Sequence, residues 1–293
     1  MPIGMALLML KRNNQKLFIN SRDKKLWLEI ITKQYKDNQM QIKILGCSGG
    51  IGGNMRTTSI LIDDDVLIDA GTGVGDLSLD ALLKIDHIFV THSHLDHIVS
   101  IPLLLDTVMG LRREPVTVHA TLEVINILKQ HVFNWLIWPN FNLIPDPATP
   151  FLKYNEICVG NGVQIGGKTI TAVPANHVIP AVGYHINSGE NSLVFTGDTA
   201  GSAAFWHDVN QIDNLKVLII ETAFSNAEAE LAMLSKHLCP ATLATELAHL
   251  QSQPQVFITH LKPGEDTTIM QEIAANPQTA HCKALEQQQI FNL

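Results

Sequence analysis

The chain has 293 residues, 46% of them hydrophobic, and its 20 Lys and Arg against 28 Asp and Glu leave a net charge of −8 at pH 7. A chain of this length and composition can bury a substantial core, and we expect one large domain. No long basic run or basic stripe occurs. Extended nucleic acid is therefore not an expected partner, because binding to its phosphates needs clustered Lys and Arg.

Cysteine spacing and apolar segments indicate the cellular localisation of the protein. Cys47, Cys158, Cys239 and Cys282 are scattered, without a CxxC pair, which argues against a disulfide framework. The apolar run at residues 5–10 is far shorter than the roughly 20 residues that cross a bilayer, and it lacks the flanks of a signal peptide. We expect a cytoplasmic protein with no membrane partner.

The first 39 residues differ in pattern from the remainder. Residues 23–31 could form a short amphipathic helix. An alternating strand then begins at Met40, where an initiator methionine would stand. We predict that residues 1–39 are an N-terminal extension, either an added segment or a start codon assigned too far upstream, and that residues 40–293 form the functional domain.

Strand-like and helical patterns alternate through residues 40–293. The glycine-rich residues 46–54 lack the Lys-Ser/Thr of a P-loop and precede a strand, so a tight loop is the favoured interpretation. The predicted strands are residues 40–45, 58–62, 66–69, 88–90, 116–119, 170–173, 184–186, 193–195, 217–220 and 256–258. The predicted helices are residues 98–109, 122–131, 227–237 and 241–251.

One short segment, Thr91-His92-Ser93-His94-Leu95-Asp96-His97, concentrates metal-binding residue types just after the strand at residues 88–90. Alternation along the strand end and the following turn would aim His92 and His94 to one side and Asp96 and His97 to the other. Imidazole nitrogens with a carboxylate suit Zn²⁺ or a similar ion. Solvated loop histidines are the alternative, which the ligand-like spacing disfavours.

Three later strand ends supply the residues that a two-metal site would still lack. His177, Asp198 and His260 each follow an apolar run. Two divalent ions roughly 3.5 to 4 Å apart need negative charge between them. Asp198 suits that position because the preceding Gly197 lets the backbone come close.

This order of motifs resembles the metallo-β-lactamase superfamily of hydrolases. The resemblance implies a four-layer αβ/βα sandwich of two mixed β-sheets with outer helices. It also implies two divalent metal ions, for which Zn²⁺ is the natural choice, and a carboxylate at Asp69 that orients the ligands, although a turn before Gly71 would also select Asp. Carried position by position, His92, His94 and His177 would bind one ion, Asp96, His97 and His260 the other, and Asp198 would bridge them.

Within the superfamily, the chain resembles the class II 3',5'-cyclic-nucleotide phosphodiesterases. The similar segments are residues 92–101, 134–141, 174–184 and 220–224. Ser100 departs from the glycine of many superfamily members, which alters the helix start but removes no ligand. The resemblance implies hydrolysis of cyclic AMP or cyclic GMP to a 5'-nucleotide, with a metal-bridging hydroxide attacking phosphorus and with Asp96 and Asp198 among the catalytic groups.

Two other functions stay open. A tRNA 3'-processing endonuclease, or another hydrolase of this fold, would use the same metals, but the missing basic segment argues against an RNA substrate. A metal-binding protein without turnover is disfavoured by the complete ligand set and by His237. We therefore expect a small cyclic nucleotide as the partner and leave a homodimer open.

The sequence around three further residues suggests a role for each. His237 ends one helical stretch just before another and could protonate the leaving 3' oxygen, unless it is a helix-terminal histidine favoured by the helix dipole. Trp138 and Phe141 belong to an aromatic cluster in a Pro-rich insertion. A nucleobase could stack on them, or the rings could close the core or form a dimer contact.

Overall fold

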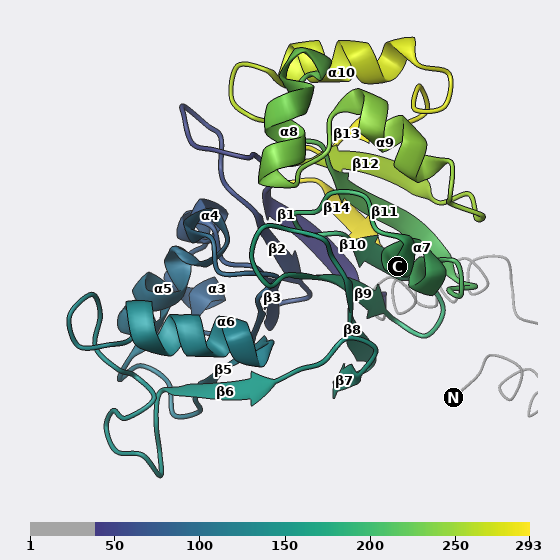
Figure 1. Ribbon diagram of the computed structural model, residues 1–293. Helices are drawn as coiled ribbons and strands as arrows, with labels where there is room; N and C mark the ends of the chain where they lie inside the picture. The colour runs from purple at the N-terminus through teal and green to yellow at the C-terminus, as the bar shows by residue number, and fades with distance from the viewer. Residues whose placement is uncertain (1–38) are drawn as a thin grey trace, which may run out of the picture. The chain divides into compact units, whose positions relative to one another are not determined.

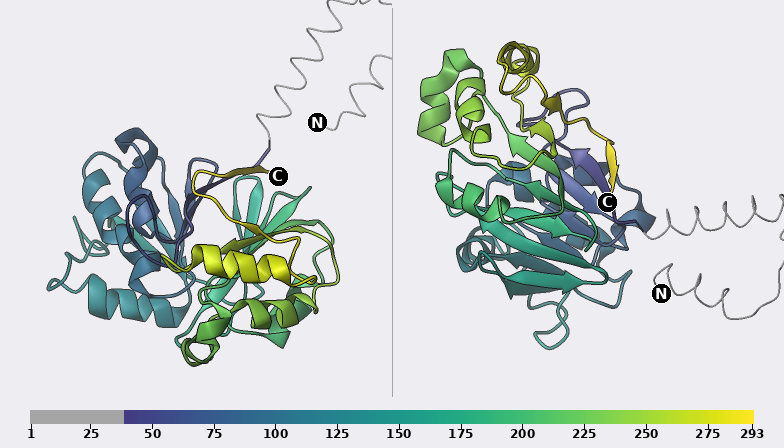
Figure 2. Two further views of the ribbon diagram at one scale, coloured as in Figure 1. Left: turned by 90° about the horizontal axis from the view of Figure 1, so that it is seen from above. Right: turned by 90° about the vertical axis from the view of Figure 1, so that its right-hand side faces the viewer.

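The computed structural model describes residues 39–293 (Figure 1). The predicted extension and its amphipathic helix lie outside the described residues, apart from Gln39. The described part contains two seven-stranded β-sheets with helices on their outer faces, as Figure 2 shows from two further directions. The predicted αβ/βα sandwich of two mixed sheets is confirmed.

The first sheet has the strand order β14-β1-β2-β3-β4-β5-β6. Its strands are β1 (Gln41–Gly46), β2 (Ser59–Ile62), β3 (Val66–Ile68), β4 (His87–Phe89), β5 (Val116–Ala120), β6 (Leu152–Glu156) and β14 (Ile290–Asn292). The pairs from β14 to β3 are antiparallel, and those from β3 to β6 are parallel. The parallel half therefore brings the carboxyl ends of β3 and β4 to the same edge of the sheet.

The second sheet repeats this mixed plan in the order β13-β12-β11-β10-β9-β8-β7. Its strands are β7 (Gly162–Ile165), β8 (Lys168–Pro174), β9 (Val182–Asn187), β10 (Ser192–Phe195), β11 (Leu215–Glu221), β12 (Gln255–Thr259) and β13 (Lys283–Ala284). Strands β7 to β10 are antiparallel, and β10 to β13 are parallel. Three carboxyl ends, those of β10, β11 and β12, thus meet at one edge.

Both faces of the central strands are buried, which explains their continuous apolar runs. In β3, Ile68 packs between the sheets while Leu67 packs under the outer helices. In β11, Ile219 points into the same inner core while Leu218 faces the outer helices of the second sheet. Alternate side chains of one strand therefore serve two cores.

The helices lie on the outer faces of the two sheets (Figures 1 and 2). The α-helices are α3 (Leu79–Leu82), α4 (Leu95–Ile98), α5 (Ser100–Val108), α6 (Leu122–Ile127), α7 (Ala203–Val209), α8 (Ala229–Ser235), α9 (Pro240–Leu247) and α10 (Asp266–Ala275). Three short helical turns accompany them, η1 (Thr72–Asp76), η2 (Leu128–Val132) and η3 (Asn226–Glu228). Within residues 39–293, no helix combines the length and the apolar character that crossing a bilayer requires.

Every predicted strand and helix is present, but several elements were not predicted. Strands β6 and β7 were missed because most of their side chains are half-buried or exposed, so their apolar pattern is weak. The predicted helix at residues 122–131 is α6 followed by the π-turn η2. The helix predicted for residues 227–237 ends earlier, because Lys236 adopts the left-handed conformation, with φ of 54°.

Candidate metal centre

The His-rich segment occupies the junction between β4 and α4. Thr91 and His92 continue from the strand, and His94 is the N-cap of α4. Asp96 and His97 lie in the helix itself. His92 and His94 fall in one group of ligand-type residues and Asp96 and His97 in the other, as predicted, but a change from extended to helical backbone separates the pairs rather than alternation along a strand end.

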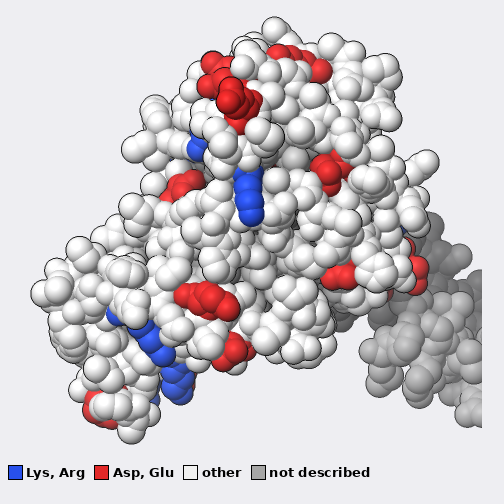
Figure 3. All heavy atoms as spheres, viewed as in Figure 1, with Lys and Arg blue, Asp and Glu red and all other residues white. Residues whose placement is uncertain are grey.

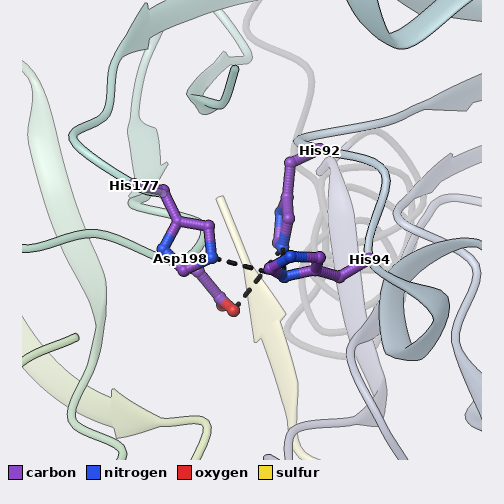
Figure 4. A group of neighbouring side chains, drawn as sticks. All are labelled: His92, His94, His177 and Asp198. Carbon is purple, nitrogen blue, oxygen red and sulfur yellow. Dashed lines mark hydrogen bonds and ion pairs between the residues drawn. The ribbon is translucent and has the colours of Figure 1, made fainter. Parts of the chain in front are cut away.

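The first group of side chains is His92, His94, His177 and Asp198, whose candidate ligand atoms all lie within 4.8 Å of one another (Figure 4). His94 Nδ1 lies 3.1 Å from His92 Nε2 and 3.3 Å from His177 Nε2. Asp198 Oδ2 lies 3.6 Å from His92 Nε2. Three imidazoles and a carboxylate therefore converge on one point, from the segments after β4, β8 and β10.

The second group is Asp96, His97, Asp198 and His260, which meets the same 4.8 Å criterion. His260 Nε2 lies 3.2 Å from Asp96 Oδ2 and 3.3 Å from Asp198 Oδ2. His97 Nε2 lies 3.4 Å from Asp198 Oδ1. Asp198 thus belongs to both groups, with its carboxylate between them. The structure brings together all seven predicted ligand residues in the predicted two sets.

The side chains of this centre fit a metal cation. His97 is fully buried, and its Nε2 atom has no hydrogen-bond partner within residues 39–293 although it faces two carboxylates. A buried polar atom without a partner costs about 1 to 3 kcal/mol, a cost that coordination would remove. Imidazole and carboxylate donors suit a borderline first-row ion.

Asp69 supports the centre from the end of β3. Its carboxylate lies 2.7 Å from His97 Nδ1 and accepts hydrogen bonds of 2.8 Å from the backbone N–H and the hydroxyl of Thr91. Thr91 Oγ1 lies 3.0 Å from His92 Nδ1. One buried carboxylate therefore orients a histidine of each group, directly or through a hydroxyl, as carboxylates behind metal-binding histidines do.

Charges within the centre shift its pKa values. Burial opposes ionisation of Asp198, but the nearby charges of His260 and His97 hold the pKa of Asp198 well below its usual range. Burial also opposes charge on His97, yet Asp198 and Asp69 raise the pKa of His97 well above its usual value. Burial lowers the pKa of His177 to about 4. The carboxylate of Asp198 is thus ionised at neutral pH and can neutralise bound cations.

His237 also lies at this centre. Lys236 turns the chain after α8, and the ring of His237 then stacks on His260, with ring centroids 5.2 Å apart and planes 19° apart. The ring of His177 is 4.9 Å away. His237 Nδ1 lies 2.7 Å from Glu221 Oε1. Burial opposes its protonation, but the hydrogen bond and charge of Glu221 raise the pKa of His237 overall.

Sequence reasoning assigned no role to Glu221, which is fully buried at the end of β11. Its carboxylate accepts hydrogen bonds from the backbone N–H groups of Thr199 and Leu238, at 3.0 and 3.3 Å. Glu221 therefore links the turn after Asp198 to the segment that carries His237. The sequence did carry a signal for Glu221, because a carboxylate at the end of an apolar strand, as at Asp69, marks a candidate site residue.

The two predicted substrate-contacting aromatics lie in the outer core of the first sheet. Phe141 is only 1% exposed, and its ring lies 6.4 Å from those of Phe133 and Phe151. Trp138 is half-buried against the same cluster. A base could stack on Phe141 only by displacing these neighbours. This burial matches the core-closing role, one of the alternatives left open by the sequence.

A sandwich of two mixed sheets with a buried His/Asp centre at the strand ends defines a class of metal-dependent hydrolase fold. A family model described as a beta-lactamase superfamily domain matches residues 65–277. The chain belongs to this family, the metallo-β-lactamase superfamily that the motif order predicted.

Relatives of two activities are similar to the chain. A probable 3',5'-cyclic-nucleotide phosphodiesterase of Yersinia pestis is 25% identical over 204 residues, covering 61% of this chain and 58% of that protein. A ribonuclease Z of Haloarcula marismortui is 30% identical over 169 residues, covering 55% of this chain and 51% of that protein. The chain thus spans little more than half the length of these relatives.

A solved structure shares the fold over nearly its whole length. The crystal structure of unliganded yeast PDE1 superposes with a TM-score of 0.71 at 18% sequence identity, covering 87% of this chain and 99% of that one. Similarity at this level of identity establishes the fold alone.

Proposed function

We propose that the protein is a dinuclear metal-dependent phosphodiesterase that hydrolyses 3',5'-cyclic nucleotides, cyclic AMP or cyclic GMP, to 5'-nucleotides. The observation that carries the proposal is the position of Asp198, whose carboxylate lies 3.6 Å from His92 Nε2 of the first group and 3.3 and 3.4 Å from His260 Nε2 and His97 Nε2 of the second. A carboxylate shared in this way suits two cations held close together. Histidine-rich donor sets favour Zn²⁺.

In the proposed reaction, the metal ions and the surrounding side chains have different roles. Two such ions, when bound, supply a water activated near neutral pH and a positive clamp for a phosphodiester. Asp69 and Thr91 fix the orientation of the histidines. His237, whose Nδ1 lies 2.7 Å from Glu221 Oε1, would give a proton to the departing 3' oxygen, which is a poor leaving group without it.

Charge distribution favours a small substrate. Figure 3 shows a short row of basic side chains at the lower left and otherwise isolated ones interspersed with acidic ones. An extended RNA would be bound through a larger basic tract. A small phosphodiester needs only the positive charge of the cations themselves.

A tRNA 3'-processing endonuclease is the second candidate, because the Haloarcula ribonuclease Z is similar to the chain at a comparable level. Both candidates use the same centre, so the substrate must separate them. A metal-binding protein without turnover is the third alternative from the sequence.

The test is a substrate panel for the zinc-loaded protein: cyclic AMP, cyclic GMP, a tRNA precursor with a 3' trailer, and bis(p-nitrophenyl) phosphate. Asp198→Ala, purified in parallel, controls for contaminating enzymes. We expect 5'-nucleotides from a cyclic nucleotide and no cleavage of the precursor. Precursor cleavage without cyclic-nucleotide turnover would establish the endonuclease instead. Two bound ions with no turnover of any substrate would support the non-catalytic alternative.

A further inference from the structure

His260 lacks the hydrogen-bond support that three of the other ligand-type histidines have. Its Nε2 atom faces Asp96 and Asp198, but its Nδ1 atom is buried and has no hydrogen-bond partner among the described residues. The corresponding atoms of three neighbours do have one. These are Nδ1 of His92 with Thr91 Oγ1, Nδ1 of His97 with Asp69 Oδ2, and Nδ1 of His177 with Lys236 O. Something other than a hydrogen bond must therefore orient the ring of His260.

The backbone of His260 is also unusual. Its φ of 64° lies in the left-handed region, which a residue with a Cβ atom adopts at a cost of about 1 kcal/mol or more. Only 2% of the residue is exposed. A conformation of this kind persists when the surrounding structure imposes it.

Gly49, in the glycine-rich loop after β1, is the surface against which His260 packs. A Cβ atom at Gly49 would lie 2.5 Å from His260 O, 2.8 Å from His260 Nδ1 and 3.1 Å from His260 Cε1. Real Cβ atoms essentially never show the two shorter distances, and the contact with Cε1 is also tight. Any side chain at residue 49 would thus push on the backbone and the ring of His260 together.

Hydrogen bonds tie this loop to the chain around His260. The backbone N–H of His260 donates to Cys47 O at 2.8 Å, and that of Gly49 donates to Leu261 O at 3.0 Å. Ser48 Oγ donates to the same carbonyl at 3.3 Å, and Lys262 Nζ donates to Gly49 O at 2.8 Å. The glycine contact is therefore held in place from both sides of residue 260.

We propose that Gly49 is a positioning residue for the second metal group: its bare backbone sets the ring plane of His260 and so directs Nε2 toward Asp96 and Asp198. The proposal rests on the dinuclear centre of the proposed function, but not on its substrate. It assigns the glycine-rich loop to the group of Asp96, His97 and His260. The group of His92, His94 and His177 has no such contact with Gly49 in the described residues.

The test compares Gly49→Ala with Gly75→Ala and Gly167→Ala. A Cβ atom at Gly75 or Gly167 would meet no heavy atom within 4 Å, so these controls add the same methyl group in open space. Metal-free proteins are titrated with Zn²⁺, and the bound ions are counted by elemental analysis. We expect the controls to bind two ions like the wild type, and Gly49→Ala to bind the second roughly 10- to 100-fold more weakly, as when a supporting contact is lost.

A double variant tests whether Gly49 acts through His260. In a His260→Ala background, adding Gly49→Ala should change the affinity for the second ion no further. An additional loss there, or wild-type binding of both ions by Gly49→Ala, would overturn the proposal.

If Gly49→Ala does not fold, Lys262→Met provides the test, because it loosens the loop without adding atoms beside His260. A lower affinity for the second ion with an unchanged affinity for the first would support the proposal. Unchanged affinities for both ions would overturn it. These readouts are separable from the proposed function. If the wild type binds two ions but hydrolyses no cyclic nucleotide, only the proposed substrate is wrong. If the wild type binds a single ion, the basis of both proposals is removed.

Discussion

Glu221 Oε1 lies 2.7 Å from His237 Nδ1, and this contact joins the end of β11 to the turn after α8. Glu221 is fully buried, so its negative charge needs a compensating partner. A protonated His237 provides one, and the hydrogen bond engages Nδ1, which leaves Nε2 as the other nitrogen of the ring. The pair has the geometry of a base or acid held by an orienting carboxylate.

The first prediction concerns His237→Ala. We expect the variant to keep its fold and both metals but to lose about 10² to 10⁴ in kcat on cyclic AMP, the usual contribution of a positioned proton donor. The loss should be much smaller on a substrate with a nitrophenolate leaving group, because that group departs without a proton. The measurement is kcat on both substrates, with bound metal counted in each sample.

Equal losses of kcat on the two substrates, or loss of metal from His237→Ala, would show that His237 has a structural role and is not a proton donor. Glu221→Gln is the companion variant, since the amide keeps the shape of the side chain but removes its charge. It should show the same dependence on leaving group, with a smaller loss on cyclic AMP.

The second prediction is that Asp198→Ala is among the most damaging changes. The carboxylate is common to both groups of ligand atoms, so its removal takes one donor from each group and the negative charge between them. We expect the wild type to bind two ions per chain, chelation to abolish hydrolysis, and Asp198→Ala to bind fewer than two ions. Elemental analysis counts the bound ions in both proteins, and hydrolysis is measured before and after chelation. Fully active wild-type protein with one ion or fewer would refute the dinuclear centre.

The seven candidate ligands could be read from the sequence because each follows an apolar strand at a spacing set by local structure. In a mixed sheet, the carboxyl ends of parallel strands meet at one edge, so strand ends far apart in sequence meet in space. The fold was predicted from the resemblance of this order of motifs to the metallo-β-lactamase superfamily. Asp69 could be found similarly, because a charged residue that closes an apolar strand is conspicuous.

What the sequence could not provide are contacts between segments distant along the chain. Gly49 and His260 are separated by over 200 residues, and nothing local marks their packing. The left-handed conformation of Lys236 depends on its surroundings, since the residue itself disfavours it. Burial of Phe141 could not be told from exposure because aromatic residues serve both cores and binding surfaces.

The third prediction is that deletion of residues 1–39 leaves a folded and active protein. Met40 is buried, and its backbone exchanges hydrogen bonds with that of Leu293, at 3.0 and 2.9 Å, next to the paired strands β1 and β14. A chain that starts at Met40 keeps this pairing. Thermal unfolding and kcat/KM should match those of the full chain within measurement error. An insoluble or inactive truncation would mean that the segment, including Leu26 and Ile30, is part of the fold.

The fourth prediction concerns pH and His185, which lies in β9 away from the metal centre. Burial lowers the pKa of His185 to about 4, and its Nε2 atom has no hydrogen-bond partner in the part of the chain that the structure describes. The unfolded chain, with a histidine pKa of about 6.5, takes up this proton first as the pH falls. The contribution of His185 to stability is thus fully present above about pH 6.5 and is lost as the pH drops toward 4.

His185→Leu removes this titration. Between pH 7 and pH 5, the free energy of unfolding of the metal-free wild type should therefore fall by up to about 2 kcal/mol more than that of the variant. Urea unfolding at each pH measures the difference. Between pH 7 and pH 8 the two proteins should change in parallel, because the ring is neutral in both the folded and the unfolded state. Parallel curves down to pH 5 would show that His185 takes up its proton in the folded protein as readily as in the unfolded chain.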